Sequence, residues 1–151
     1  MKLLVKDVFE SRTLSLIVKE EEQITEIIKH YAEKPSLRGI FVVDKGQKLK
    51  GVISRTDLLQ WAKFKIGADI GSDNIAVDEI NRYAYSTTAK DIMYRYSVET
   101  FVKPEDNLEL ALEMMLSEDI LAIPVVDEEK KIVGDLTLSE VLNAIVRTQV
   151  D

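Results

Sequence analysis

Two short polar clusters are the places where this chain could hold a small molecule. "SRTD" at 54–57 follows the apolar run "KGVI", and "TLSE" at 137–140 follows "VGDL". Each cluster leads directly into an apolar segment, a pattern that places it where a strand ends and a helix begins. At such a place a hydroxyl and free backbone N–H groups can bind an anion, and a carboxylate can accept hydrogen bonds from sugar hydroxyls.

Both clusters also fit a purely structural role. Ser/Thr-x-x-Glu before an apolar run is a capping box, in which the hydroxyl and the carboxylate satisfy the N–H groups of their own helix. "TLSE" suits that role better than "SRTD", because Glu is the favoured third residue and Asp is shorter. We therefore expect Thr137 and Glu140 to be structural. We favour ligand binding for Ser54 and Asp57, because Arg55 beside them is a planar donor suited to phosphate.

The two clusters belong to an internal repeat. With an offset of about 84 positions, "VKDVFESRTLSLIVKEEEQITEII" lies over "AKDIMYRYSVETFVKPEDNLELAL". After one residue is dropped, "GIFVVDKGQKLKGVISRTDLL" lies over "AIPVVDEEKKIVGDLTLSEVL". The shared skeleton is apolar-x-Val-Val-Asp, a polar turn, a glycine, a strand, the polar cluster and a helix.

Each copy predicts the same elements in the same order. "EEQITEIIKHYAE" and "EDNLELALEMMLSE" have apolar residues at helical spacing. "IFVVD" and "IPVVD", each followed by a turn and a second apolar run, predict hairpins. With an opening strand and a closing helix, the order is strand, helix, strand, strand, helix, twice. The predicted fold class is α+β.

A connector separates the copies. We assign 1–66 to the first copy, 67–88 to the connector and 89–151 to the second copy. A copy of about 60 residues buries too little surface to be stable alone, so the two are expected to pack face to face. In the connector, Val77, Ile80 and Ala84 would lie on one face of a short helix, whose function the sequence does not indicate.

Composition narrows the functional classes. The 151 residues include 27 acidic and 20 basic ones, and the net charge of −7 argues against non-specific nucleic-acid binding. The lack of cysteine fits a reducing compartment, so we expect a cytoplasmic protein. No targeting or membrane-spanning segment is expected, because the apolar runs are short. The single histidine, His30, is expected on a helix surface, and no metal site is expected.

The duplicated motifs resemble the CBS domain, named for cystathionine β-synthase, in the tandem form called a Bateman module. The Lys-Asp-apolar start, the Ile-x-Val-Val-Asp strand ("IFVVD" and "IPVVD") and Gly-x-apolar-Ser/Thr-x-x-Asp/Glu occur twice in order. The resemblance implies two β-α-β-β-α units packed through their sheets about a pseudo-two-fold axis. It also implies two clefts between the units. In many such proteins these bind AMP, ADP, ATP or S-adenosylmethionine, with no further cofactor required.

The resemblance also implies which residues bind. Asp57 would accept from the ribose hydroxyls, and Ser54 with Arg55 would contact phosphates. The residues implied for the first cleft are Gly51, Ile53, Ser54, Arg55, Thr56, Asp57, Glu99, Thr100, Leu121, Ala122, Ile123 and Pro124.

The second cleft departs from the family pattern. Glu140 stands where the family usually has Asp, and Leu138 stands where the first copy has Arg55. The residues implied there are Thr137 and Glu140, with Ser15 and Arg38 from the first copy. We expect weaker binding than in the first cleft, or none.

The closing helices predict a partner surface. They are apolar over more than one face, so we expect a homodimer through Leu58, Trp61, Val141 and Ile145.

Three functional hypotheses follow, and the first is favoured. The chain is a regulatory sensor of an adenosyl ligand that signals to an unknown effector protein; or a ligand-free interaction scaffold; or an enzyme. Against an enzyme, the sequence shows no activated nucleophile, P-loop or metal-ligand spacing, so no catalytic residue is assigned.

Overall fold

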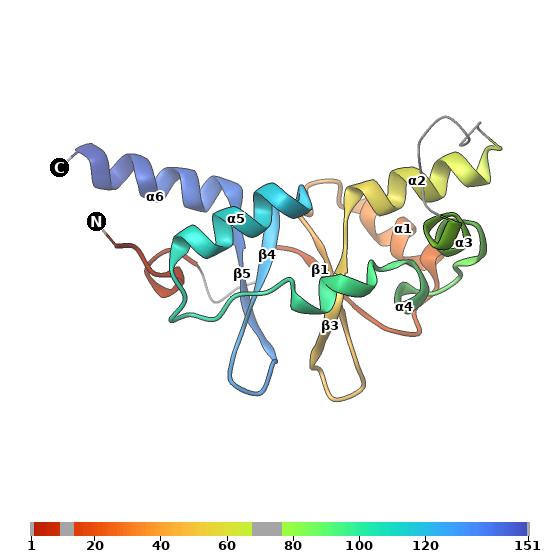
Figure 1. Ribbon diagram of the computed structural model, residues 1–151, viewed down its shortest axis with the longest axis horizontal. Helices are drawn as coiled ribbons and strands as arrows, with labels where there is room; N and C mark the ends of the chain where they lie inside the picture. The colour runs from red at the N-terminus through yellow and green to blue at the C-terminus, as the bar shows by residue number, and fades with distance from the viewer. Residues whose placement is uncertain (1, 10–13, 68–76, 151) are drawn as a thin grey trace.

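The computed structural model describes residues 2–9, 14–67 and 77–150, and contains two repeats built from helices and β-hairpins (Figure 1). This is the α+β architecture that the duplicated pattern predicts. The elements are η1 Val5–Asp7, β1 Leu16–Lys19, α1 Ile24–Glu33, β2 Ile40–Val43, β3 Leu49–Ile53, α2 Arg55–Lys65, α3 Val77–Tyr85, α4 Ala89–Ile92, η2 Arg95–Glu99, α5 Leu108–Glu118, β4 Ala122–Val126, β5 Ile132–Thr137 and α6 Leu138–Val150.

The first repeat contains a three-stranded sheet. β1 pairs with β2 in parallel, and β2 pairs with β3 in antiparallel orientation, in the order β1-β2-β3. All four residues of β2 are buried, as its β-branched and aromatic composition favours. Ile24 and Ile27 of α1 are buried in the same core as Val18 and Val42. The helical spacing of these isoleucines therefore places α1 on the sheet.

The second repeat lacks a regular opening strand, which corrects the predicted element order. β4 and β5 form a two-stranded sheet, and Val102 makes only an isolated parallel bridge with Val125. Pro104 stands where the first repeat has Glu20, whose N–H donates to the Val43 carbonyl at 3.0 Å. Since proline has no N–H, the second ladder cannot extend in the same way.

The two repeats exchange their opening segments. Val5 lies in the core of the second repeat, and its N–H donates to the Asp106 carbonyl at 2.9 Å. Ala89 lies in the core of the first repeat, and its N–H donates to the Glu22 carbonyl at 2.9 Å. This exchange brings the start of the second repeat against the polar cluster of the first.

The hairpins of the two repeats pack against each other. Phe41, Leu49 and Val52 share a buried cluster with Ala122 and Val126. Figure 1 shows the turns of both hairpins at one end of the molecule and helices α2 and α6 at the opposite end. The expected packing through the sheets is therefore present.

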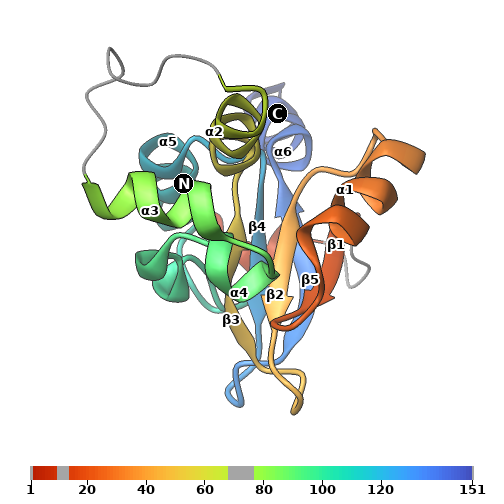
Figure 2. The ribbon, with the colours of Figure 1, turned by 90° about the vertical axis from the view of Figure 1, so that its right-hand side faces the viewer.

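The connector contributes the predicted helix, α3, which lies beside α2 (Figure 2). Ile80 and Ala84 are half-buried, and Tyr83 is buried, with its ring centroid 6.1 Å from that of Phe64 on α2. Residues 68–76 of the connector lie outside the described residues. A helix with the length and hydrophobicity of a bilayer span does not occur within the described residues.

The closing helices α2 and α6 use most of their predicted partner residues internally. Val141 is fully buried in the core of its own repeat, so it cannot contact a second chain, which corrects that assignment. Leu58, Trp61 and Ile145 are half-buried against the cores of their own repeats. The apolar residues that these helices expose are Leu59, Leu142 and Val146.

Candidate functional site

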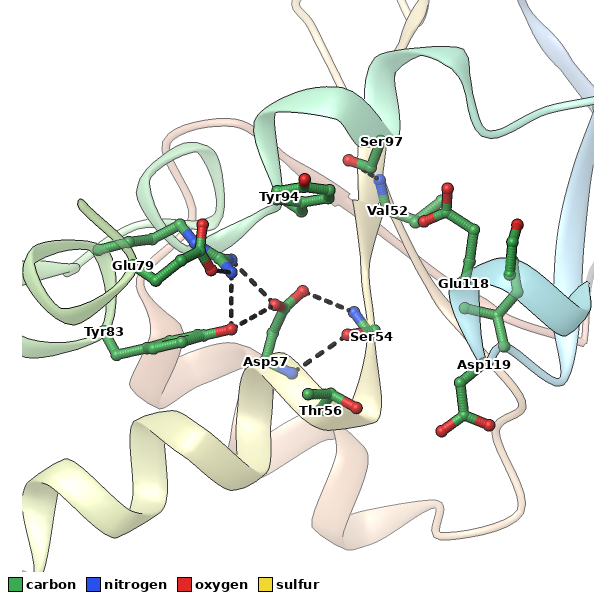
Figure 3. A pocket seen from close by; sticks show the side chains of 13 residues that line it. Val52, Ser54, Thr56, Asp57, Glu79, Tyr83, Tyr94, Ser97, Glu118 and Asp119 are labelled. Atoms are coloured by element: carbon green, nitrogen blue, oxygen red, sulfur yellow. Dashed lines mark hydrogen bonds and ion pairs between the residues drawn. The ribbon is translucent and has the colours of Figure 1, made fainter. Parts of the chain in front are cut away.

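The first cleft contains a cavity of about 520 Å³ around the polar cluster 54–57. Both repeats and the connector helix contribute to its walls (Figure 3). This volume lies within the range of small-molecule sites in proteins. Its lining residues are Val52, Ser54, Thr56, Asp57, Glu79, Arg82, Tyr83, Tyr94, Ser97, Ser117, Glu118, Asp119 and Ile120.

A smaller and more enclosed cavity of about 130 Å³ adjoins the first. The two cavities share Val52, Ser54, Asp119 and Ile120. Its own walls are both apolar and polar, and they include the predicted residues Ile53, Arg55, Leu121 and Ala122, together with Tyr31, Pro35, Leu37, Arg38, Gly39, Ile40 and Phe41. The residues predicted for the first cleft are therefore divided between two adjoining cavities.

Ser54 and Asp57 form a capping box at the start of α2. The Asp57 N–H donates to Ser54 Oγ at 3.1 Å, and the Ser54 N–H donates to Asp57 Oδ2 at 3.0 Å. Ser54 has extended backbone dihedrals, φ −88° and ψ 163°, as an N-cap residue requires. Both bonds form, so the shorter Asp side chain closes this box, and the predicted ligand contact of Ser54 and Asp57 stays a prediction.

The second oxygen of Asp57 is held by the connector. Arg82 Nη1 donates to Asp57 Oδ1 at 2.9 Å, and the Tyr83 hydroxyl donates to the same oxygen at 3.1 Å (Figure 3). Asp57 is 3% exposed. Burial and the Asp57 charge raise the pKa of Tyr83 well above its ordinary value, so this hydroxyl stays protonated and remains a donor.

Arg82 lies at the centre of a dense set of contacts. Its Nη2 is paired with Glu79, its Nη1 also donates to the Ile92 carbonyl, and its guanidinium lies over the rings of Tyr83 and Tyr94 at 4.3 and 5.5 Å. Burial alone would lower the pKa of Arg82, but the hydrogen bonds to Glu79 and Asp57 outweigh burial and raise it. Arg82 therefore holds a permanent charge in the cavity wall.

Arg55 points away from Asp57. Its Nη2 pairs with the Asp119 carboxylate at 3.1 Å, and both side chains are exposed. Asp119 ends α5 in the left-handed conformation, with φ 51° and ψ 51°. This ion pair joins the first repeat to the second between the two cavities, which both have Asp119 in their walls.

Several of the other predicted residues do not line these two cavities. Gly51 is buried in β3, and Ile123 and Pro124 are buried in β4. Thr100 is buried and Glu99 is exposed, and neither lines the two cavities described above. From the opening segment of the second repeat, Tyr94 and Ser97 line the larger cavity instead of Glu99 and Thr100. Ser97 Oγ accepts from the Val52 N–H at 3.0 Å.

Ser15, a residue predicted for the second cleft, is hydrogen-bonded to a buried aspartate. Ser15 Oγ donates to Asp135 Oδ2 at 2.7 Å, and the Leu14 N–H donates to the same oxygen at 3.1 Å. Asp135 is almost fully buried and occupies the position that Val52 has in the first repeat. Burial raises the pKa of Asp135, although the bonds from Ser15 and Leu14 oppose that shift.

Glu140 folds back onto its own helix start. Its Oε1 accepts from the Thr137 N–H at 2.9 Å and from the Thr137 hydroxyl at 2.8 Å, which is the structural role expected for this pair. Arg38 and Thr137 line a shallow, mainly apolar cavity of about 190 Å³ with Leu121, Leu138, Ser139 and Leu142. The four residues predicted for this cleft are thus divided between a closed hydrogen-bond cluster and a small cavity.

The sequence alone did not reveal the contribution of the connector. Glu79, Arg82 and Tyr83 come from a segment without a counterpart in the repeat, so comparison of the copies could not assign them. The one available signal was the helical spacing of Val77, Ile80 and Ala84. Within the described ranges, three or more His, Asp or Glu side chains do not gather as a metal site would require.

The fold and the cleft define a tandem pair of CBS domains. The CBS domain model matches residues 5–63 and 88–147, and the chain belongs to this family.

Solved structures agree over nearly the whole chain. A CBS domain-containing protein from Thermotoga maritima is 31% identical, with a TM-score of 0.75, over 96% of this chain and 95% of that one. The CBS-pair protein CBSX2 from Arabidopsis thaliana, in its complex with AMP, is 25% identical, with a TM-score of 0.70, over 97% and 98%. The cytosolic domain of the Mg²⁺ channel MgtE, in complex with ATP, is 26% identical, with a TM-score of 0.60, over 91% of this chain and 46% of that one.

Proposed function

We propose that this protein is a regulatory module that binds an adenosine-containing ligand in the first cleft and signals its occupancy to a partner protein. The observation that carries the proposal is the 520 Å³ cavity, which both repeats line around Ser54, Thr56 and Asp57. A ligand that touches both repeats favours one relative orientation of them, and such a population shift changes the surface offered to a partner.

The adjoining compartments support an adenosyl ligand. The smaller, more enclosed cavity has Phe41, Ile53 and Leu121 in its walls, which suits a base, and the larger one offers the Thr56 hydroxyl and the Asp57 carboxylate to a sugar and its substituent. CBSX2 in complex with AMP and MgtE in complex with ATP are relatives with ligands of this class. No cofactor is assigned besides this ligand.

Calorimetry and thermal unfolding test the proposal against AMP, ADP, ATP, 5′-methylthioadenosine and S-adenosylmethionine. A ligand at 100 times its dissociation constant stabilises the fold by about 2.7 kcal/mol. For a chain of this length we expect the midpoint to rise by roughly 5–10 °C. If none of the five compounds shifts the midpoint or releases heat, the proposal is refuted.

A matched pair of variants locates the binding site. Thr56 is exposed at the cavity wall, and Ser139 is exposed at the same position of the second repeat. Thr56→Trp fills the first cleft with an indole ring and should weaken binding at least about tenfold, or about 1.4 kcal/mol. Ser139→Trp should leave the affinity unchanged. The reverse result would move the site to the second cleft.

A ligand-free scaffold is the alternative function. It is favoured by the hydrogen bonds of the second cleft, where Ser15 already donates to Asp135.

With or without a ligand, we propose that the protein forms a homodimer through exposed residues of the closing helices. Leu59, Leu142 and Val146 are apolar and lie on the surface.

A further inference from the structure

The carboxylate assigned to ribose is already occupied by the chain's own connector. Asp57 Oδ2 accepts from the Ser54 N–H, and Oδ1 accepts from Arg82 and Tyr83. A carboxylate offers about four lone-pair positions, so three of them are used. Recognition of two adjacent ribose hydroxyls needs two acceptor positions. Bidentate ribose binding at Asp57 therefore requires that α3 release Oδ1.

The α3 contacts lie where the ligand must enter. Arg82 and Tyr83 line the same cavity as Asp57, with the Tyr94 ring beside the guanidinium (Figure 3). The side chains of Arg82 and Asp57 are 13% and 4% exposed. A ligand that bonds to Asp57 Oδ1 would therefore compete with the docked α3 side chains for the same acceptor oxygen.

We propose that Arg82, with Tyr83, is an intramolecular competitor for the ligand at Asp57, so that ligand binding undocks α3. This inference rests on the proposed adenosyl-binding function. It gives the connector a role: α3 reports whether the first cleft is occupied. Because the ligand-competent state is only a fraction of the population while α3 is docked, the apparent affinity is reduced by that fraction.

The docked state has a feature that makes release feasible. Arg82 Nε is buried and has no hydrogen-bond partner among the described residues. A buried donor without a partner weakens the conformation that buries it. Undocking exposes this N–H to water, which partly compensates for the loss of the Arg82–Asp57 ion pair.

Three substitutions on α3 test whether Arg82 and Tyr83 compete with the ligand or help to bind it. Arg82→Met keeps the length of the side chain but removes the charge and all donors. We expect it to tighten binding of the best compound among AMP, ATP, 5′-methylthioadenosine and S-adenosylmethionine by about tenfold or more. Asn81→Ala changes an exposed residue of the same helix and should leave the affinity unaltered. Tyr83→Phe, which keeps the ring on Phe64, should tighten binding by a smaller factor.

Hydrogen exchange measured by mass spectrometry gives a second readout. In the unaltered protein, the same compound should speed exchange of the α3 amides, 77–85. In Arg82→Met these amides should exchange fast without ligand, and the compound should add little. The proposed competition is wrong if Arg82→Met folds but binds the compound with equal or lower affinity. It is also wrong if the compound slows hydrogen exchange in α3. Those outcomes leave adenosyl binding intact, whereas an absence of binding in both proteins removes it together with this inference.

Discussion

At the scale of single residues, equivalent carboxylates in the two repeats have different second partners. Asp57 and Glu140 each close a capping box, so this role belongs to the fold. Asp57 has an oxygen left for Arg82 and Tyr83, whereas Glu140 uses one oxygen for both the N–H and the hydroxyl of Thr137. The two carboxylates therefore differ in their contact with the connector, which only Asp57 makes among the bonds described above.

Asp135 predicts a pH-dependent stability. Its folded-state pKa is raised by burial, so the folded state holds the proton more tightly than the unfolded state. The resulting stabilisation is present below the unfolded pKa, which is near 3.8, and is lost as the pH rises through the higher folded value. Asn can accept the same bonds from Ser15 and Leu14 without a charge. Asp135→Asn should therefore unfold at a higher temperature than the unaltered protein at neutral pH.

Thermal unfolding between pH 4 and pH 7.5 checks this expectation. The difference between the midpoints of Asp135→Asn and the unaltered protein should grow with pH, because only the unaltered protein develops a buried charge. Other carboxylates titrate in both proteins and cancel in the difference. A difference that shrinks as the pH rises would contradict the prediction.

At the scale of elements, the close approach of β3 and η2 fixes how the second repeat meets the first. A Cβ at Gly51 would lie 2.5 Å from Ser97 Oγ and 2.8 Å from Met93 Sδ. Ser97 also accepts the Val52 N–H, so this contact lies directly behind the larger cavity. Gly51 is thus a packing residue of the site, and its predicted contact with a ligand stays a prediction.

Gly51→Ala should lower the free energy of unfolding by about 1–3 kcal/mol, because the added methyl group overpacks this junction. Gly46→Ala is a suitable control in the β2–β3 turn, where a Cβ would meet only Asp44 Oδ1 at 3.4 Å. Chemical denaturation of both variants gives the comparison. Equal stability of the two variants would show that the junction adapts.

At the scale of the whole molecule, the described residues leave part of the apolar surface of the closing helices exposed. α2 and α6 lie at the end of the molecule away from the hairpin turns (Figure 1). Leu59, Leu142 and Val146 are exposed there, whereas Val141 serves the core of its own repeat. A second copy that covers these residues would remove apolar area from water, which is the usual driving force for association.

Leu142→Asp tests this dimer. A charge at the centre of an apolar interface should abolish association, so light scattering after gel filtration should give the mass of one 17.1 kDa chain. Tyr85→Asp, at an exposed aromatic residue of α3, should keep the mass of the unaltered protein. An unaltered protein that already elutes as one chain would refute the dimer.

The sequence by itself determined the repeat, the element types and the place of the polar clusters. The repeat, the element types and the clusters depend on the period of apolar residues and on the residues at each helix start. Both are set by residues that are close together in the sequence. It could not foresee the short opening of the second repeat, where the Thr100 N–H is used by a turn to Ser97 and Pro104 offers none. Whether a single backbone N–H is needed for strand pairing depends on the position of the partner strand, which the sequence pattern does not give.

Only the tertiary structure decided what surrounds Asp57. Arg82 and Tyr83 are 25 and 26 residues away in the chain, and nothing local to either segment encodes their meeting. The same holds for Ser15 and Asp135, which are 120 residues apart. Such contacts follow from the exchange of opening segments and the docking of α3. They arise from packing between repeats, which a periodic pattern within one repeat cannot specify.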